Sequence, residues 1–133
     1  MKISSGAVTD SRSSLRRTQR SLNRIMIGTM QTPTGELTLR TLAMPADANA
    51  AGDIFGGWVM AQMDLASGIR AAERAKGRVV TAAVKEMAFQ LPVKIGDTLS
   101  IYTHITRVGT TSITLLIEAW AQRSRYQKME KVT

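Results

Sequence analysis

Hydrophobic and polar residues follow two different periods along this chain. In residues 36–44 the side chains alternate between two faces, which is typical of a half-buried β-strand. In residues 57–76 apolar side chains recur at spacings of three and four, which predicts one long helix. The apolar positions of this helix are Trp58, Ala61, Leu65, Ile69 and Ala72. Pro45 ends the strand, and Gly77 is expected to end the helix.

Three further alternating segments follow the helix, at residues 79–89, 98–108 and 111–122. One strand, one long helix and then a run of strands predict an α+β domain in which a sheet packs against the helix. Small residues lie on several sides of the helix, which suits a helix wrapped by a curved sheet. Gly68 costs roughly 1 kcal/mol of helix propensity, so we expect packing to require a glycine there.

Length and charge exclude several classes of protein. A chain of 133 residues is long enough for one domain with a real core and too short for two. The formal net charge is +8, but the first thirty residues, with six basic side chains and one acidic one, contribute +5 of it. The remaining excess is mild and has no interleaved aromatic residues, which argues against nucleic acid as a partner. No apolar run is long enough to predict a membrane span, and the lack of cysteine excludes thiolate catalysis.

Residues 1–33 are predicted to be a basic, disordered extension in front of a domain at residues 34–133. They are rich in serine and arginine and show neither strand alternation nor a sustained apolar stripe. Two explanations fit this composition. One is an organellar import segment, and the other is a translation start at Met26 or Met30, which would make the segment an artefact. The second is favoured slightly, and with it a cytoplasmic location.

The candidate chemistry lies in residues 47–58, at the mouth of the predicted helix. Gly56 and Gly57 allow a ligand to approach the backbone closely, and free amides at a helix start carry partial positive charge. Such amides polarise a carbonyl oxygen, and an acid beside them, Asp53, can activate water. The structural alternative for Asp53 is a simple cap on the helix.

Three collinear segments resemble the acyl-CoA thioesterases of the hotdog fold, and among them the bacterial YciA-like group. They read LRTLAMPADANAAGDIFGGWVMAQMD from Leu39, GRVVTAAVKEMAFQLPVKIGD from Gly77 and RVGTTSITLLIEAW from Arg107. The resemblance implies an antiparallel sheet curled round a central helix, and self-association as a dimer or a trimer of dimers. It also implies hydrolysis of fatty acyl-CoA to free fatty acid and CoA. No metal and no cofactor are implied, since CoA is part of the substrate.

Carried over residue by residue, the resemblance assigns the catalytic roles to one loop. Asp53 would act as general base or nucleophile, Asn49 would position water or the acyl group, and the amide of Gly57 would hold the oxyanion. A thioester carbonyl is more electrophilic than that of an ester, so a carboxylate with backbone polarisation can suffice without a Ser-His pair. Asn49 has an equally good alternative role, because asparagine is common in turns for its own hydrogen bonds.

The resemblance also indicates residues that bind substrate. Gly56 and Trp58 lie at the helix start, and Thr81 is expected to line the pocket across a dimer interface, although an ordinary strand threonine explains it at least as well. Basic residues near the mouth of an acyl tunnel would attract the CoA phosphates, and each is otherwise a solvated surface charge. These basic candidates are Arg78, Lys94, Arg107 and Lys128.

Two other polar residues have simpler structural interpretations. His104 stands on a predicted strand without a histidine or acid at ligand spacing, so it is not a metal candidate. Asp64 lies in the middle of the predicted helix. It is either a second carboxylate of the site or, more simply, a partner in a local polar contact.

The last strand is predicted to be truncated at Thr133, because the family it resembles continues with further strand residues there. Losing that half of the strand would leave backbone groups of the neighbouring strands unpaired. The main alternative function is a non-catalytic acyl-CoA-binding sensor, since a fold does not fix a function. A third is an adaptor that binds nucleic acid or membrane through residues 1–30.

Overall fold

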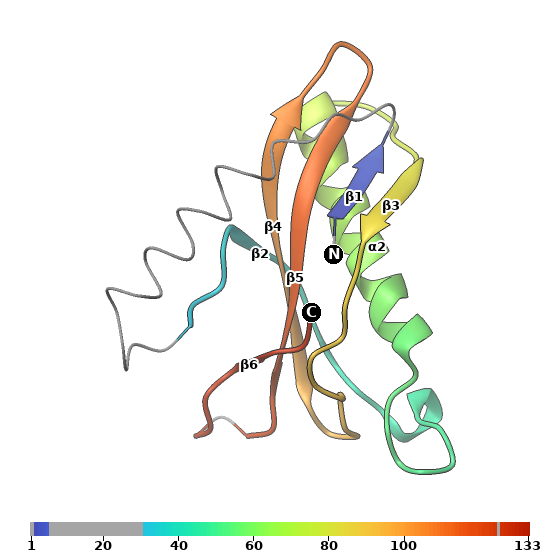
Figure 1. Ribbon diagram of the computed structural model, residues 1–133, viewed down its shortest axis with the longest axis vertical. Coiled ribbons are helices and arrows are strands. Elements are labelled where there is room, and N and C mark those ends of the chain that lie inside the picture. Colours follow the sequence, from blue (N-terminus) through green and yellow to red (C-terminus); the bar gives the residue numbers. More distant parts are fainter. Residues whose placement is uncertain (1, 6–30, 125) are drawn as a thin grey trace.

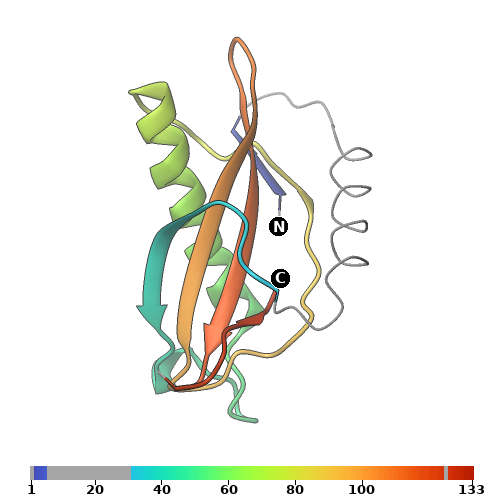
Figure 2. The same ribbon diagram turned by 90° about the vertical axis from the view of Figure 1, so that its left-hand side faces the viewer.

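One long helix lies along one face of an antiparallel sheet in the computed structural model of this chain (Figures 1 and 2). The structure describes residues 2–5, 31–124 and 126–133. The helix is α2, Gly56–Ala75, and a short 3-10 helix, η1, covers Pro45–Asp47. The strands are β1 (Lys2–Ser5), β2 (Glu36–Leu42), β3 (Ala83–Glu86), β4 (Thr98–Val108), β5 (Ile113–Gln122) and β6 (Glu130–Lys131). Their spatial order is β2-β4-β5-β1-β3, and β6 also pairs with β5.

The hairpin of β4 and β5 forms the centre of the sheet. The two strands pair in antiparallel register, and a backbone hydrogen bond of 2.7 Å from the Gly109 N–H to the Ser112 carbonyl closes the turn. Side chains of a strand alternate between its faces, so one face of the hairpin supplies every second residue to the core. The buried residues of this core include Leu99, Ile101, Leu115, Ile117 and Ala119, together with Val59, Met63, Ala66 and Ala71 of α2.

The carboxylate of Glu118 is buried on the other face of β5, where it binds three polar groups. Glu118 accepts a hydrogen bond of 2.9 Å from the Trp120 indole N–H and one of 3.2 Å from the Thr34 backbone N–H. The ammonium of Lys131 lies 3.7 Å from the same carboxylate. A buried charge is tolerated when it is paired and hydrogen-bonded, and these contacts join the segments before β2 and in β6 to the middle of the sheet.

The observed bounds of the helix and of β4 agree closely with those predicted from the spacing of neighbouring residues. The helix begins and ends within one residue of the prediction, and β4 matches it at both ends. The residues at the two ends of the helix differ from the prediction. Phe55 is the N-cap residue and no side chain caps the helix, so Asp53 does not play that role. At the other end the left-handed residue is Lys76, with φ of 53°, rather than Gly77.

The strands at the far side of the sheet differ more from the prediction. The segment expected at residues 79–89 forms only β3, Ala83–Glu86, and all four of its residues are exposed. Strand β1 lies inside the extension predicted to be disordered, so that prediction is wrong for these four residues. Residues 6–30 lie outside the described part of the chain, and the domain boundary at residue 34 stays a prediction. No described helix is long and apolar enough to cross a membrane.

The expectation of unpaired backbone beside a truncated last strand is also wrong. Strand β6 is indeed short, and it pairs with β5 only at Trp120 and Ala121. The first residues of β5 are nevertheless paired, because β1 occupies that side of the strand. The sheet thus has a strand on both sides of β5.

The same substitution to alanine at Gly35 and at Gly68 tests the packing around these two glycines. Gly35 has φ of +93°, and a Cβ there would lie 2.3 Å from the Thr103 carbonyl oxygen, whereas a Cβ on Gly68 would meet nothing within 4 Å. The expectation that packing requires Gly68 is therefore wrong within this chain. We expect Gly35→Ala to lower the free energy of unfolding by roughly 1–3 kcal/mol, and Gly68→Ala to raise it by up to about 1 kcal/mol. Urea unfolding measures both, and an equal loss in the two variants would contradict this packing.

Candidate active site

Asp53 lies in a loop that the side chain of Asn49 holds in shape. The amide oxygen of Asn49 accepts hydrogen bonds from the backbone N–H groups of Ala51 and Asp53, at 3.0 and 3.1 Å. The Asn49 N–H in turn donates to the Asp53 carbonyl at 2.7 Å. Gly52, with φ of +84°, allows the tight bend between them. The turn-forming role of Asn49 is thus observed, and it fixes the backbone that carries Asp53.

A second turn, residues 92–97, braces this loop from the side. Backbone pairing joins Asp53 to Lys94, and the Ile54 N–H donates to the Val93 carbonyl at 2.9 Å. The turn is itself organised by the buried carboxylate of Asp97, which accepts the Lys94 N–H at 2.9 Å. Asp53 therefore stands on backbone that is hydrogen-bonded on both sides.

The Asp53 carboxylate forms an ion pair with the ammonium of Lys94. The two side chains are 36% and 45% exposed, so the pair lies at the surface and remains open to water. Only one carboxylate oxygen takes part, and the structure records no further hydrogen bond to this carboxylate from the described residues. The second oxygen thus remains available to a water molecule or a substrate atom.

The start of α2 provides an open backbone surface beside Asp53. A Cβ on Gly57 would meet nothing within 4 Å, so a ligand can reach the backbone there. Gly57 lies in the first turn, where amides have no carbonyl partner within the helix. Gly56 is more enclosed, since a Cβ there would lie 3.3 Å from the ring of Phe89. Trp58 is half-buried and packs against the core, which makes it a support for the helix start.

Phe89 is a site residue that the sequence pattern did not reveal. Its ring borders Gly56, and both Phe89 and Phe55 are about half exposed, at 46% and 54%. Two exposed aromatic rings beside open glycine backbone give an apolar border of the kind that an acyl chain contacts. The spacing of 33 residues between Gly56 and Phe89 carries no local signal. The pairing of Lys94 with Asp53 was likewise missed, although Lys94 was considered as a CoA ligand.

Thr81 and Arg78 do not lie beside Asp53 in the single chain. The Thr81 hydroxyl donates to the carboxylate of Asp64, seven residues along α2 from Gly57 and so about 10 Å away along the helix. Asp64 thus makes the local polar contact that was its simpler interpretation. Arg78 follows the far end of α2, whose 20 residues span about 30 Å.

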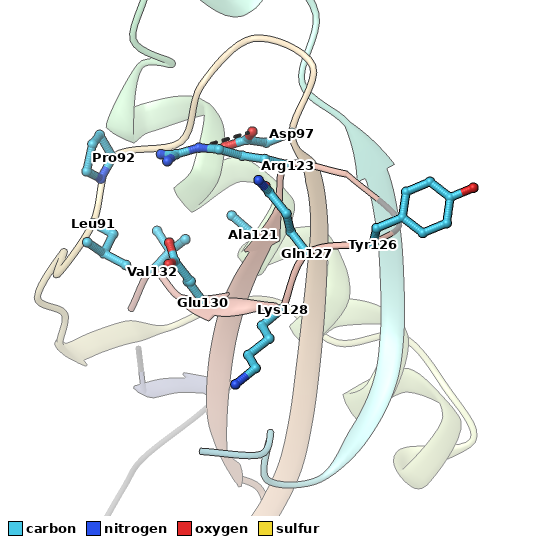
Figure 3. Close-up of a pocket in the computed structure, with 10 residues that line it drawn as sticks. All are labelled: Leu91, Pro92, Asp97, Ala121, Arg123, Tyr126, Gln127, Lys128, Glu130 and Val132. Atoms are coloured by element: carbon cyan, nitrogen blue, oxygen red, sulfur yellow. Dashed lines mark ion pairs between the residues drawn. The ribbon is translucent and has the colours of Figure 1, made fainter. Parts of the chain in front are cut away.

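A separate pocket of about 440 Å³ lies beside the 92–97 turn (Figure 3). Arg123 spans it and lies 3.7 Å from the Asp97 carboxylate, while Tyr126 points away from it (Figure 3). Its walls are Leu91, Pro92, Asp97, Ala121, Arg123, Tyr126, Gln127, Lys128, Glu130 and Val132. Of the residues predicted for the site, only Lys128 lines this pocket. The pocket and the Asp53 loop are therefore two different places.

The described residues hold no group of three or more potential metal ligands, and His104 is exposed on β4.

Residues 51–127 match the sequence family described as the Thioesterase superfamily. The chain belongs to this family. The matched region includes Asp53 and the start of α2, and the helix against an antiparallel sheet is the hotdog arrangement that the sequence predicts.

Named relatives and solved structures agree with this membership. The chain is 56% identical to the acyl-CoA thioester hydrolase YciA of Salmonella typhimurium over 69% of each chain. It is 52% identical to an uncharacterized acyl-CoA thioester hydrolase of Buchnera aphidicola, over 76% of this chain and 75% of the relative.

Two solved hexamers of this thioesterase family share the fold. A hexameric thioesterase from Yersinia pestis, with 49% identity, superposes with a TM-score of 0.72 over 77% of this chain and 87% of that one. HI0827, a hexameric broad-specificity acyl-coenzyme A thioesterase solved as an aspartate-to-alanine mutant, has 45% identity. Its TM-score is 0.73, over 77% of this chain and 76% of that one.

The contacts of the loop predict which substitutions alter its stability. Asn49→Ala removes two hydrogen bonds from the loop and should lower the free energy of unfolding by about 1–3 kcal/mol. Lys94→Ala breaks an exposed ion pair and should cost less than about 1 kcal/mol. Chemical denaturation of the two variants compares these losses. A larger loss in the Lys94 variant would show that the ion pair, rather than Asn49, holds the loop.

Proposed function

We propose that this protein hydrolyses acyl-CoA thioesters to a carboxylic acid and CoA, with fatty acyl groups as the substrate class. One observation carries the proposal. A carboxylate with a free oxygen, Asp53, stands on a loop braced from two sides, four residues before Gly57, whose amide lies in the first turn of α2 and whose Cβ position is open. Relatives that share about half of their residues with this chain are named acyl-CoA thioester hydrolases.

In the proposed reaction Asp53 activates water or attacks the thioester itself, and the Gly57 amide stabilises the negative charge on the carbonyl oxygen. Asp53 removes a proton from water, and the resulting hydroxide attacks the thioester carbon; alternatively, the carboxylate attacks this carbon directly and water then cleaves the mixed anhydride. In both routes the carbonyl oxygen gains negative charge, which the Gly57 amide stabilises, and CoA leaves as a thiolate that takes up a proton. A single donor of this kind contributes about 3 kcal/mol to lowering the barrier. The reaction uses no metal and no dissociable cofactor.

The supporting residues follow from the same geometry. Asn49 keeps the loop in the conformation that presents Asp53, and Lys94 holds one carboxylate oxygen so that the other faces the substrate. Phe55 and Phe89 border the acyl group, and Gly56 and Trp58 shape the helix start beside it. A cytoplasmic location remains part of this proposal.

We further propose that the active protein is an oligomer. All four residues of β3 are exposed at the end of the sheet, and Val80 and Val84 are exposed apolar side chains at this edge. The outer edge of β3 pairs with no other described strand, and an edge with apolar side chains is suited to pairing with a second copy. Solved relatives are hexamers, which is compatible with a dimer or a trimer of dimers. Pairing would allow Thr81 and Arg78 to serve a site on the partner, since they are remote from Asp53 of their own chain.

The role of Asp53 is tested by removing its charge while keeping its shape. Asp53→Asn should lower kcat for CoA release roughly 100- to 10,000-fold, because the amide can neither accept the proton of water nor attack the thioester. Asp47→Asn is the matched control, since Asp47 is the acid at the end of η1, just before the loop, and among the described residues its carboxylate accepts only the Met44 N–H, at 3.2 Å. A thiol-reactive dye measures released CoA. Equal turnover by the folded Asp53 variant would overturn the mechanism, and acyl-CoA binding without turnover by the unaltered protein would indicate a sensor.

The amide of Gly57 is tested by two substitutions at one position. Gly57→Ala keeps the N–H and its methyl group would meet no protein atom within 4 Å, so activity should fall only through crowding of the ligand, and by less than in the proline variant. Gly57→Pro removes the N–H at a first-turn position, where helices tolerate proline, and should lower kcat roughly 100-fold. Thermal melts of both variants check the fold. Equal activity of the two variants would exclude this amide as the oxyanion donor.

A further inference from the structure

The side of β5 that faces away from β4 is covered by two segments from opposite ends of the chain. Strand β6 and the residues after it pair with residues 119–121, and the Val132 N–H donates to the Ala119 carbonyl at 2.8 Å. Strand β1 pairs with residues 113–116, from Lys2 opposite Leu116 to Ser5 opposite Ile113. Both segments run antiparallel to β5, so they point the same way along one line. β1 continues this line toward the start of β5, and Figure 1 shows β1 and β6 beside β5.

Strand β1 is also the connection between β3 and the rest of the sheet. β3 pairs with β1 and with no other strand of the described chain, in a register that places Ile3 opposite Val84 and Ser4 opposite Ala83. In the segment before β3, the Thr81 hydroxyl donates a hydrogen bond to the Asp64 carboxylate. In the segment after β3, the ring of Phe89 lies beside Gly56. One further tie, from the Gln90 N–H to the Val132 carbonyl at 2.7 Å, holds the chain after β3. Residues 81–90, which we call the β3 wall, are therefore attached to the sheet through β1 and through this one tie.

We propose that the space between β5 and β3 is a strand-binding slot and that residues 2–5 of the same chain are its occupant. Occupation of the slot would complete the sheet and hold the β3 wall in place for catalysis. Such a slot binds through main-chain hydrogen bonds, as in recognition by strand addition. Without an occupant, β5 would lose partners for residues 113–116, of which Ile113, Thr114 and Leu115 are buried. A chain that starts at Met26 or Met30 would lack this strand.

The slot is tested first by deletion and addition. A variant that lacks residues 1–5 should melt more than about 5 °C lower than the full chain and release CoA roughly ten-fold more slowly. A synthetic peptide of residues 1–10 should restore both quantities, whereas a scrambled peptide of the same composition should not. An unchanged melting temperature in the deletion variant would overturn the proposal, and so would equal rescue by the scrambled peptide.

The second test keeps the chain at full length. Ile3 lies opposite Val84 on one side and Leu115 on the other, and proline is poorly tolerated in a strand that is paired on both sides because it lacks an N–H. Hydrogen exchange should then become faster in residues 83–86 and 113–116 but not in β2. Gln31→Pro is the matched control, because Gln31 is exposed and outside regular structure. Equal exchange in the unaltered chain and the Ile3→Pro variant would contradict the slot. This readout does not depend on thioesterase activity, so it distinguishes failure of the slot from failure of the proposed function.

Discussion

The backbone contact between residues 45–55 and residues 92–97 is the constraint on which the candidate site depends. It joins Ile54 to Val93 through a hydrogen bond of 2.9 Å, and Asn49 fixes the same loop from within. Backbone hydrogen bonds restrict the conformations of the residues between them. The position of the Asp53 side chain is therefore fixed by the backbone of the loop rather than by contacts of the side chain itself. Because α2 begins at Gly56, the carboxylate and the open amides belong to one short unit.

The remainder of the fold supports this unit from two directions. The hairpin of β4 and β5 packs against the buried side of α2 and keeps the helix start in place. Phe89, three residues after β3, borders the helix start at Gly56, and β3 itself is weakly anchored, with exposed residues and, among the described strands, pairing with β1 alone. This weak attachment is consistent with the proposal that a second subunit completes the site.

Local patterns in the sequence predict most of the architecture, and distant pairings account for the rest. The spacing of apolar residues locates α2 and β4 because helix and strand periods are properties of neighbouring residues. The length of β3 depends on β1, which precedes it by about eighty residues, and no local signal carries that information.

The residues of the candidate site also fall into two groups: those close together in the sequence and those far apart in it. The loop from Asp53 to Gly57 is continuous in sequence, so the sequence alone places this acid just before the helix start. Lys94 reaches Asp53 across 41 residues, and this ion pair was not foreseen. The remoteness of Arg78 was available from the sequence, since a helix of 20 residues spans about 30 Å.

The most direct test of the account is to compare acyl-CoA binding with CoA release in one preparation of the full chain. Calorimetry with a non-hydrolysable acyl-CoA thioether gives the number of binding sites, and release from the matching thioester gives the turnover of those sites. The account predicts many turnovers per site, with acid and CoA formed in equal amounts. Saturable binding with less than one turnover per site would contradict it, because Asp53 and the open helix start would then bind an acyl group without hydrolysing it.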